Sequence, residues 1–191
     1  MNIFFLDTDP RIAAYSYCDQ HLGKIRLDIS QMLSTAYHLS PHVTVKEKYV
    51  GMTNYVNKHL NKPIYEYYVQ GHRIYKQAFV NHHTCRWVRA SAGNFEWTLE
   101  HLKALQEIWV RFGYDGSVTY HLLSTFEATK HLLLLTGNLT DVPLAMYDSV
   151  KENYKPQEPM KVAVQAYKQY MCAKVFKNDK RPTWSINKQP E

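Results

Sequence analysis

Residues 18–38 constrain the fold most, because they predict one long helix with two different stripes of side chains. Apolar residues recur there at steps of three and four, which places them along one side of a helix with ~3.6 residues per turn. They are Leu22, Ile25, Ile29, Met32, Leu33, Ala36 and Leu39. A helix side that is apolar over its whole length has to be covered by other parts of the chain. We therefore expect this helix at the centre of a helical domain.

A polar stripe runs beside the apolar one at the same spacing. Its members are His21, Lys24, Asp28, Gln31, Thr35 and His38. Imidazole, ammonium, carboxylate, amide and hydroxyl groups in one line are the groups that acid–base and phosphate-binding sites use. A plain polar rim beside a buried face is the alternative interpretation, since polar residues commonly border a core. The sequence leaves both open.

The length of the chain favours a single domain over residues 1–191, because two separate cores of this total length would each be small. Its apolar runs are far shorter than the roughly 20 residues that cross a bilayer, so no membrane span is predicted. The first residues lack a basic start and soon reach Asp7, which is not typical of a secretory signal. A cytoplasmic location is expected.

The chain carries an excess of positive charge. Its 23 Lys and Arg against 17 Asp and Glu give a formal net charge of +6, and ten histidines add charge when protonated. This balance is compatible with DNA or a nucleotide as partner, although many enzymes share it. Cys18, Cys85 and Cys172 lie too far apart for a disulfide framework or a paired metal motif. We expect reduced thiols, no metal and no cofactor.

Most of the remaining chain also has helical spacing, so we predict a mainly α fold with a short extended segment at residues 3–6. Asp9-Pro10 is typical of a helix start and Ser40-Pro41 of a helix end. Further helices are expected over residues 91–112, 117–135 and 160–176. Residues 43–62 predict an exposed excursion, and residues 177–191 predict a basic, extended tail.

Residues 82–89 concentrate groups that bind phosphate. Arg86 and Arg89 offer guanidinium groups, and Trp87 between them offers a face on which a base can stack. In the alternative interpretation Trp87 belongs to the core, and Arg89 is a neighbour that keeps only its charged end in solvent. The histidines and the cysteine of this segment lack a second ligand pair at zinc spacing, so a metal site is not predicted.

Asn94, Trp97 and His101 follow at helical steps on the next predicted helix. Their polar groups are predicted to face the polar stripe of the first long helix across a cleft, which would put Asp28 and Arg89 in one groove. A buried Asn and His that bond each other within the core are the alternative.

Two groups of residues give the chain a resemblance to a known family. They are Asp19-Gln20-His21-Leu22 with Asp28 seven residues after the histidine, and Arg181-Pro182-Thr183-Trp184. Both resemble the pyrimidine-dimer DNA glycosylase (endonuclease V) family of phages, whose fold is a small all-helical one. A wider resemblance, to a family of phage-encoded proteins, runs through residues 1–10, 18–36, 87–91 and 145–146. It implies a phage origin and a single-domain helical bundle of the pyrimidine-dimer-glycosylase type.

The resemblance to the glycosylases implies an enzyme that cleaves an N-glycosidic bond of DNA or a nucleotide. Asp28 falls where that family keeps a catalytic glutamate, which would stabilise positive charge on the opening sugar. The family's nucleophile, the amine of an N-terminal threonine, has no counterpart, because position 2 is Asn2. Lys24 is then the candidate amine on the polar stripe.

Two functions therefore stay open. In the first, Asp28 stabilises an oxocarbenium ion or activates water, while His21 and His38 act as acid and base. In the second, the same basic, aromatic groove only captures a nucleotide, for example a host signalling nucleotide. The residues predicted to bind phosphate or nucleotide are Gln31, Thr35, Arg86, Trp87, Arg89, Asn94, Trp97, His101 and Arg181.

Overall fold

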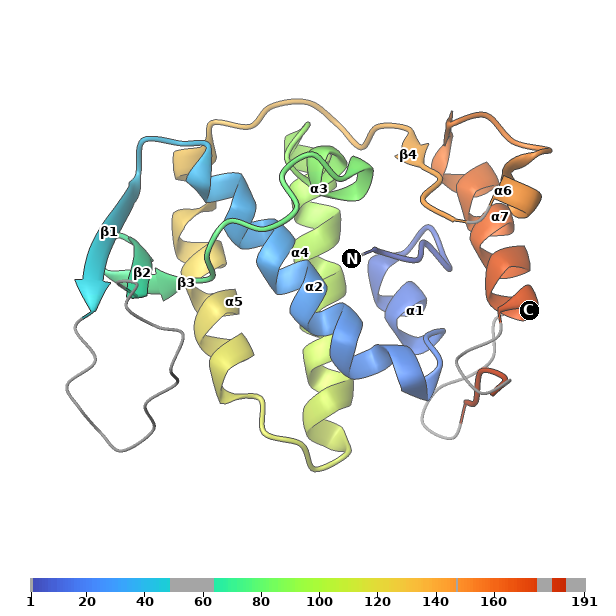
Figure 1. Ribbon diagram of the computed structural model, residues 1–191, viewed down its shortest axis with the longest axis horizontal. Coiled ribbons are helices and arrows are strands. Elements are labelled where there is room, and N and C mark those ends of the chain that lie inside the picture. The colour runs from blue at the N-terminus through green and yellow to red at the C-terminus, as the bar shows by residue number, and fades with distance from the viewer. Residues whose placement is uncertain (1, 49–63, 147, 175–179, 185–191) are drawn as a thin grey trace, which may run out of the picture.

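The computed structural model describes residues 2–48, 64–146, 148–174 and 180–184, and it is mainly α-helical (Figure 1). The α-helices are α1 (Pro10–Tyr15), α2 (Asp19–His38), α3 (His83–Val88), α4 (Ala92–Arg111), α5 (Ser117–Thr129), α6 (Asp148–Lys151) and α7 (Met160–Ala173). A 3-10 helix, η1 (Lys130–Leu133), follows α5. The strands are β1 (Val43–Lys48), β2 (Ile64–Val69), β3 (His72–Ile74), β4 (Val142–Pro143) and β5 (Gln157–Glu158). No helix among these residues is long and apolar enough to cross a membrane.

The long helix α2 crosses α4 in the middle of the molecule, with α1 and α5 beside them (Figure 1). Its predicted apolar stripe is buried from Leu22 to Ala36, which confirms the central position. Leu39 is the exception, because it is 57% exposed. The helix ends at His38, so Leu39 no longer follows the helical spacing that would have turned it inward.

The predicted ends of the other helices were right where a clear terminating residue follows. The Ser91 hydroxyl accepts the Asn94 N–H at the start of α4, and Gly113 follows its end with a φ of 82°. The prediction for residues 117–135 was too long, because α5 gives way to the tighter η1 and then to Leu134 with a left-handed φ of 51°. The last helix ends earlier than predicted, at Ala173, and Lys174 is extended.

A small antiparallel sheet stands at one end of the molecule, where no strand was predicted. Strand β1 pairs with β2, and β2 pairs with β3 across a turn at Gln70 and Gly71, both with positive φ. In the expected exposed excursion of residues 43–62, residues 44–46 are exposed as predicted, although residues 43–48 form β1, which was not predicted. The remainder, residues 49–63, lies outside the described residues.

The N-terminal residues 3–6 are buried, as predicted, and they belong to no helix or strand. The Phe4 ring contacts Tyr17, His21 and Tyr170, and the Phe5 ring contacts Trp87 and Trp97. A chain segment outside any sheet needs partners for its buried backbone groups. The Tyr17 hydroxyl supplies them to Phe4, with the N–H at 2.8 Å and the carbonyl oxygen at 2.9 Å.

Residues 180–184 belong to no helix or strand and are attached to the start of α2. The Thr183 carbonyl accepts the Asp19 N–H at 2.9 Å, and the Gln20 side chain accepts the Thr183 N–H at 3.1 Å. The Trp184 indole donates to the Ser16 carbonyl at 3.1 Å. The two sequence motifs that start α2 and end the chain therefore contact each other. The rest of the predicted tail lies outside the described residues.

Asn94, Trp97 and His101 do not face a cleft, so their predicted place in a nucleotide site is wrong. All three are buried in the core. The Trp97 indole donates to the Thr8 carbonyl at 2.9 Å, and the His101 ring lies 2.6 Å from the Pro10 carbonyl and 3.3 Å from the Tyr17 hydroxyl. Asn94 and His101 are thus buried as in the alternative interpretation, but they bond other groups rather than each other.

Asn94 instead holds the end of α3 and the chain at Thr140 onto α4. Its amide donates to the Trp87 carbonyl and to the Thr140 hydroxyl, both at 2.8 Å. Its side-chain oxygen accepts the Thr140 N–H at 2.9 Å. Three hydrogen bonds from one buried side chain fix the far end of α3, which carries part of the candidate site.

We predict that Asn94→Ala lowers the free energy of unfolding by about 3 kcal/mol, because it leaves buried donors and acceptors without partners. Asn81 is exposed and provides the matched control. Asn81→Ala should change the free energy of unfolding by less than about 0.5 kcal/mol. Urea unfolding measures both. Equal, small effects of the two substitutions would contradict the role assigned to Asn94.

Candidate functional site

The polar stripe of α2 divides into two halves with different surroundings. His21, Lys24 and Asp28 lie where α2 meets the N-terminal segment, α3 and the end of α7. Thr35 and His38 face the segment that follows β3. Gln31 is half-buried between the two halves. The structure therefore brings the first three together and separates the last two from them.

Asp28 is the buried acid of this region, with 7% of its surface exposed. The Lys24 ammonium, one helical turn earlier, lies 2.7 Å from its Oδ2 atom, while the lysine side chain itself is 63% exposed. Asp28 also lies close enough to His82, at the start of α3, for its charge to favour the protonated imidazole. Burial acts the other way and lowers the pKa of His82.

His21 is a buried histidine that stays neutral at neutral pH. Its ring packs on Phe4 with 4.7 Å between centroids, and Nδ1 lies 3.3 Å from the Cys18 sulfur. Burial, together with the positive charges of Lys174 and Lys24, lowers the pKa of His21 to about 4. An uncharged imidazole can accept a proton but has no imidazolium proton to donate, so the predicted role as an acid is not supported.

His38 lies too far from Asp28 to transfer protons in the same site. Ten residues of helix separate them, which is roughly 15 Å along the axis. Its Nε2 atom lies 2.9 Å from the Tyr75 carbonyl oxygen, and its ring meets Tyr67 edge-on. Thr35 has a similar structural role, because its hydroxyl accepts the Ala78 N–H at 3.0 Å. The predicted catalytic role of His38 and the binding role of Thr35 are wrong for a site at Asp28.

Lys174, Tyr170 and Asn2 also contribute to this region. The Lys174 ammonium donates to the Tyr170 hydroxyl at 2.8 Å and lies over the Phe4 ring at 5.7 Å. Asn2 accepts the Thr84 hydroxyl at 3.1 Å and donates to the Ala145 carbonyl. The available signal was the spacing of four between Tyr170 and Lys174, which puts both on one side of α7.

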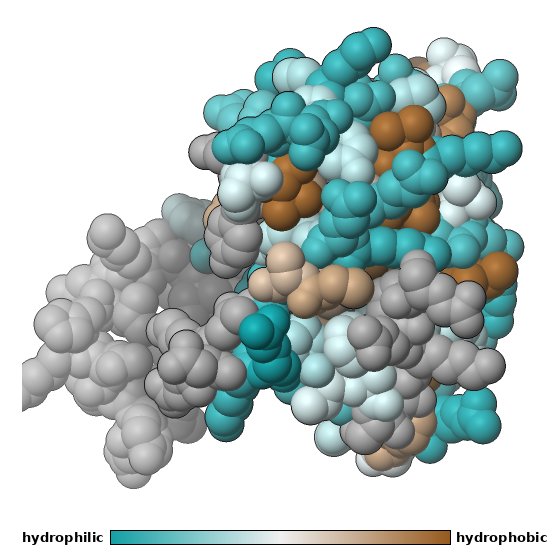
Figure 2. Space-filling view, turned by 90° about the vertical axis from the view of Figure 1, so that its right-hand side faces the viewer, coloured by the Kyte–Doolittle hydropathy of each residue, from teal (hydrophilic) through white to brown (hydrophobic). Residues whose placement is uncertain are grey.

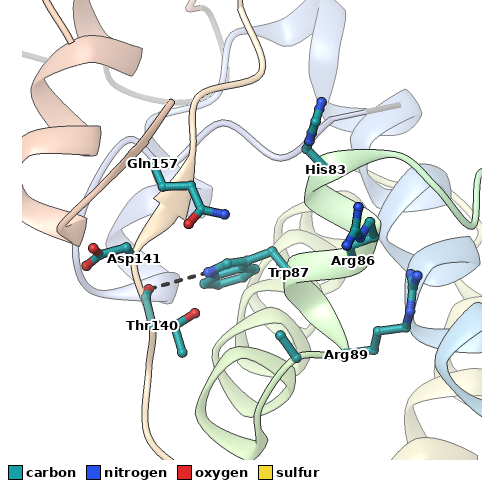
Figure 3. A pocket seen from close by; sticks show the side chains of 8 residues that line it. His83, Arg86, Trp87, Arg89, Thr140, Asp141 and Gln157 are labelled. Carbon is teal, nitrogen blue, oxygen red and sulfur yellow. Dashed lines mark hydrogen bonds between the residues drawn. The ribbon is translucent and has the colours of Figure 1, made fainter. Parts of the chain in front are cut away.

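A hollow of about 680 Å³ lies on α3, next to this region. Its lining includes His83, Arg86, Trp87, Arg89, Asp141 and Gln157 (Figure 3). Exposed His83 follows directly on His82, and their ring centroids are 6.4 Å apart. Lys24 and Asp28 on α2 thus lie near the start of α3, the helix that carries Arg86. We call these residues, with His82 and His83, the α2–α3 surface.

The predicted phosphate-binding trio on α3 does not act as one group. Arg86 is exposed, whereas the Trp87 indole is buried and points to Thr140, whose carbonyl lies 3.4 Å from its Nε1 (Figure 3). The Arg89 guanidinium donates to the Val80 carbonyl at 2.7 Å. Trp87 is therefore a core residue, and Arg89 helps to fix the segment before α3 through its bond to Val80. The exposed Arg181 lies apart from the trio in sequence, on the segment attached to the start of α2.

Within the described residues, no three His, Cys, Asp or Glu side chains form a group that could hold a metal ion. Comparisons of the chain with protein-family models, curated proteins and solved structures found no significant match. The function is therefore inferred from the geometry of the site.

The low pKa of His21 predicts a pH dependence of stability. Because burial disfavours the charged ring, the unfolded chain takes up this proton first, and the free energy of unfolding should fall as the pH drops from about 6.5 to about 4. His101, whose pKa burial also lowers to about 4, adds to the same effect. In urea unfolding, His21→Gln should reduce the slope in this range by up to ~1.4 kcal/mol per pH unit. Exposed His42→Gln is the control, and a native His21 titration centred near 6.5 by NMR would refute the prediction.

Proposed function

We propose that this chain binds a nucleic acid or nucleotide on the α2–α3 surface and that Asp28 acts on its N-glycosidic bond. The observation that carries the proposal is a buried carboxylate, held by Lys24 at 2.7 Å and close to the start of α3, the helix that carries the exposed Arg86. In this proposal the cationic side chains bind the phosphate groups of the ligand. The carboxylate stabilises positive charge on the sugar during cleavage. Phosphate binding and bond cleavage are thus both assigned to the α2–α3 surface.

Binding is supported by the exposed groups. Lys24 and Arg86 present an ammonium and a guanidinium to solvent, and the exposed His83 lines the same hollow as Arg86. Guanidinium groups bind phosphate oxygens through paired, charge-assisted hydrogen bonds. The formal net charge of +6 adds a long-range attraction for polyanions.

Cleavage is supported by the burial of Asp28. A fixed negative charge shielded from water stabilises positive charge on a nearby sugar far better than an exposed one does. Lys24 positions this carboxylate, and an ammonium engaged in an ion pair has no lone pair with which to attack a sugar. We therefore assign Lys24 to positioning and phosphate contact rather than to a Schiff base. His82 replaces His21 and His38 as the candidate proton-transfer partner.

The proposal extends to the fold type and origin. A phage-encoded helical bundle of the pyrimidine-dimer-glycosylase type is compatible with the mainly α structure. It is further supported by the contact of Asp19 and Gln20 with Thr183, because the two motifs that resemble that family are adjacent in space.

Capture of a nucleotide without cleavage is the second candidate function. It is favoured by the neutral, buried state of His21 and by the distance of His38, which remove both histidines that were predicted as acid and base. A protein that only binds phosphates gains little from a buried carboxylate.

Asp28→Asn and Arg86→Ala separate the two functions. Asp28→Asn keeps the shape but removes the charge, so base release from dimer-containing or otherwise damaged DNA should slow by about 100-fold or more, with affinity within about threefold of wild type. Arg86→Ala should weaken binding by about tenfold. Glu107→Gln and Arg111→Ala, exposed positions on α4, are the charge-matched controls.

Rates from gel-resolved cleavage and affinities from fluorescence anisotropy give both results. Wild-type protein that binds these ligands without cleaving them, while Arg86→Ala loses binding, would leave capture as the function. Absence of binding by the wild type would reject both candidates.

A further inference from the structure

A second hollow of about 680 Å³ adjoins the one on α3. It lies against the ribbon of β4 and β5 and the chain after α6, and its polar lining includes Lys151, Tyr154 and Lys155. His83 and Gln157 line both hollows, so the two are neighbours along one surface. No role was predicted for this part of the chain.

The lining of the second hollow has the chemistry of a nucleotide subsite. Among its described residues are two lysines and no carboxylate, which favours an anion. The half-buried Tyr154 ring offers a face for a base, and its hydroxyl donates to the Gln169 side chain at 3.1 Å, which limits its movement. Leu144 and Pro156 supply apolar surface beside these groups.

The backbone around this hollow is held in place. Gln157 pairs with Pro143 in the β4–β5 ribbon, and the Lys155 N–H donates to the buried Glu158 carboxylate at 2.7 Å. On the face of the molecule that carries α6 and α7, the described residues are mostly hydrophilic, with apolar side chains in small separate areas (Figure 2). A charged, extended ligand suits such a face better than an apolar protein surface does.

We infer that the second hollow binds the nucleotide next to the one held at the α2–α3 surface. The ligand is then a single strand of at least two linked nucleotides rather than a free mononucleotide. A volume of this size is ample for one nucleotide in each hollow. This inference rests on the proposed function, because it extends the same ligand from Arg86 past His83 to Lys155.

Calorimetric titration with thymidine 5′-monophosphate and with the dinucleotide pTpT tests the inferred second subsite. Wild-type protein should bind pTpT at least about tenfold more tightly than the mononucleotide. Lys155→Ala and Tyr154→Leu should each remove most of this gain and change mononucleotide binding by less than about twofold. Arg86→Ala should weaken both ligands. Lys46→Ala, which removes one exposed lysine from β1 at the opposite end of the molecule, is the control (Figure 1).

The outcomes distinguish this inference from the function on which it rests. Mononucleotide binding that depends on Arg86, with no gain for pTpT, would overturn the second subsite and leave the proposed function standing. A gain for pTpT that persists in both Lys155→Ala and Tyr154→Leu would also overturn it. Binding of neither ligand by the wild type would overturn both.

Discussion

The structure depends on burying an N-terminal segment that belongs to no sheet. Backbone groups in such a segment lose their water without gaining the partners that a strand would give them. The Tyr17 hydroxyl solves this at Phe4 by accepting its N–H and donating to its carbonyl. Tyr17 is itself fully buried and contacts His101, so the segment is bonded to the connection between α1 and α2 and, through His101, to α4.

This arrangement also positions the candidate site. The Phe4 ring supports His21 on α2 and lies under the Lys174 ammonium, at the end of α7. Asn2, two residues earlier, connects Thr84 on α3 with the carbonyl of Ala145. Helices α2, α3 and α7 therefore meet around the N-terminal segment, and Asp28 lies where the first two of them pack together.

Much of the fold could be predicted from local signals. The apolar stripe of α2, the caps at Asp9 and Ser91 and the terminating Gly113 are short-range features, and the helices follow them closely. The strands β1–β3 could not be predicted in the same way, because their stability comes from pairing between distant residues rather than from a local repeat.

The site was only partly predictable for a related reason. Helical spacing showed that Lys24 and Asp28 share one side of α2, but it could not show which stripe residues would meet other elements. Thr35 and His38 lie on the same helix and bond the chain after β3, while Asn94 turned out to hold Thr140. Polar residues at regular spacing serve a core as readily as a site, and the tertiary contacts decide between them.

The central claim is that ligand contacts concentrate on the α2–α3 surface. NMR chemical-shift mapping of ¹⁵N-labelled protein titrated with a four-nucleotide oligothymidylate tests it most directly. The account predicts the largest shifts at Lys24, His83 and Arg86, with small ones in the β1–β3 sheet. Shifts confined to that sheet, or none at saturating oligonucleotide, would contradict it.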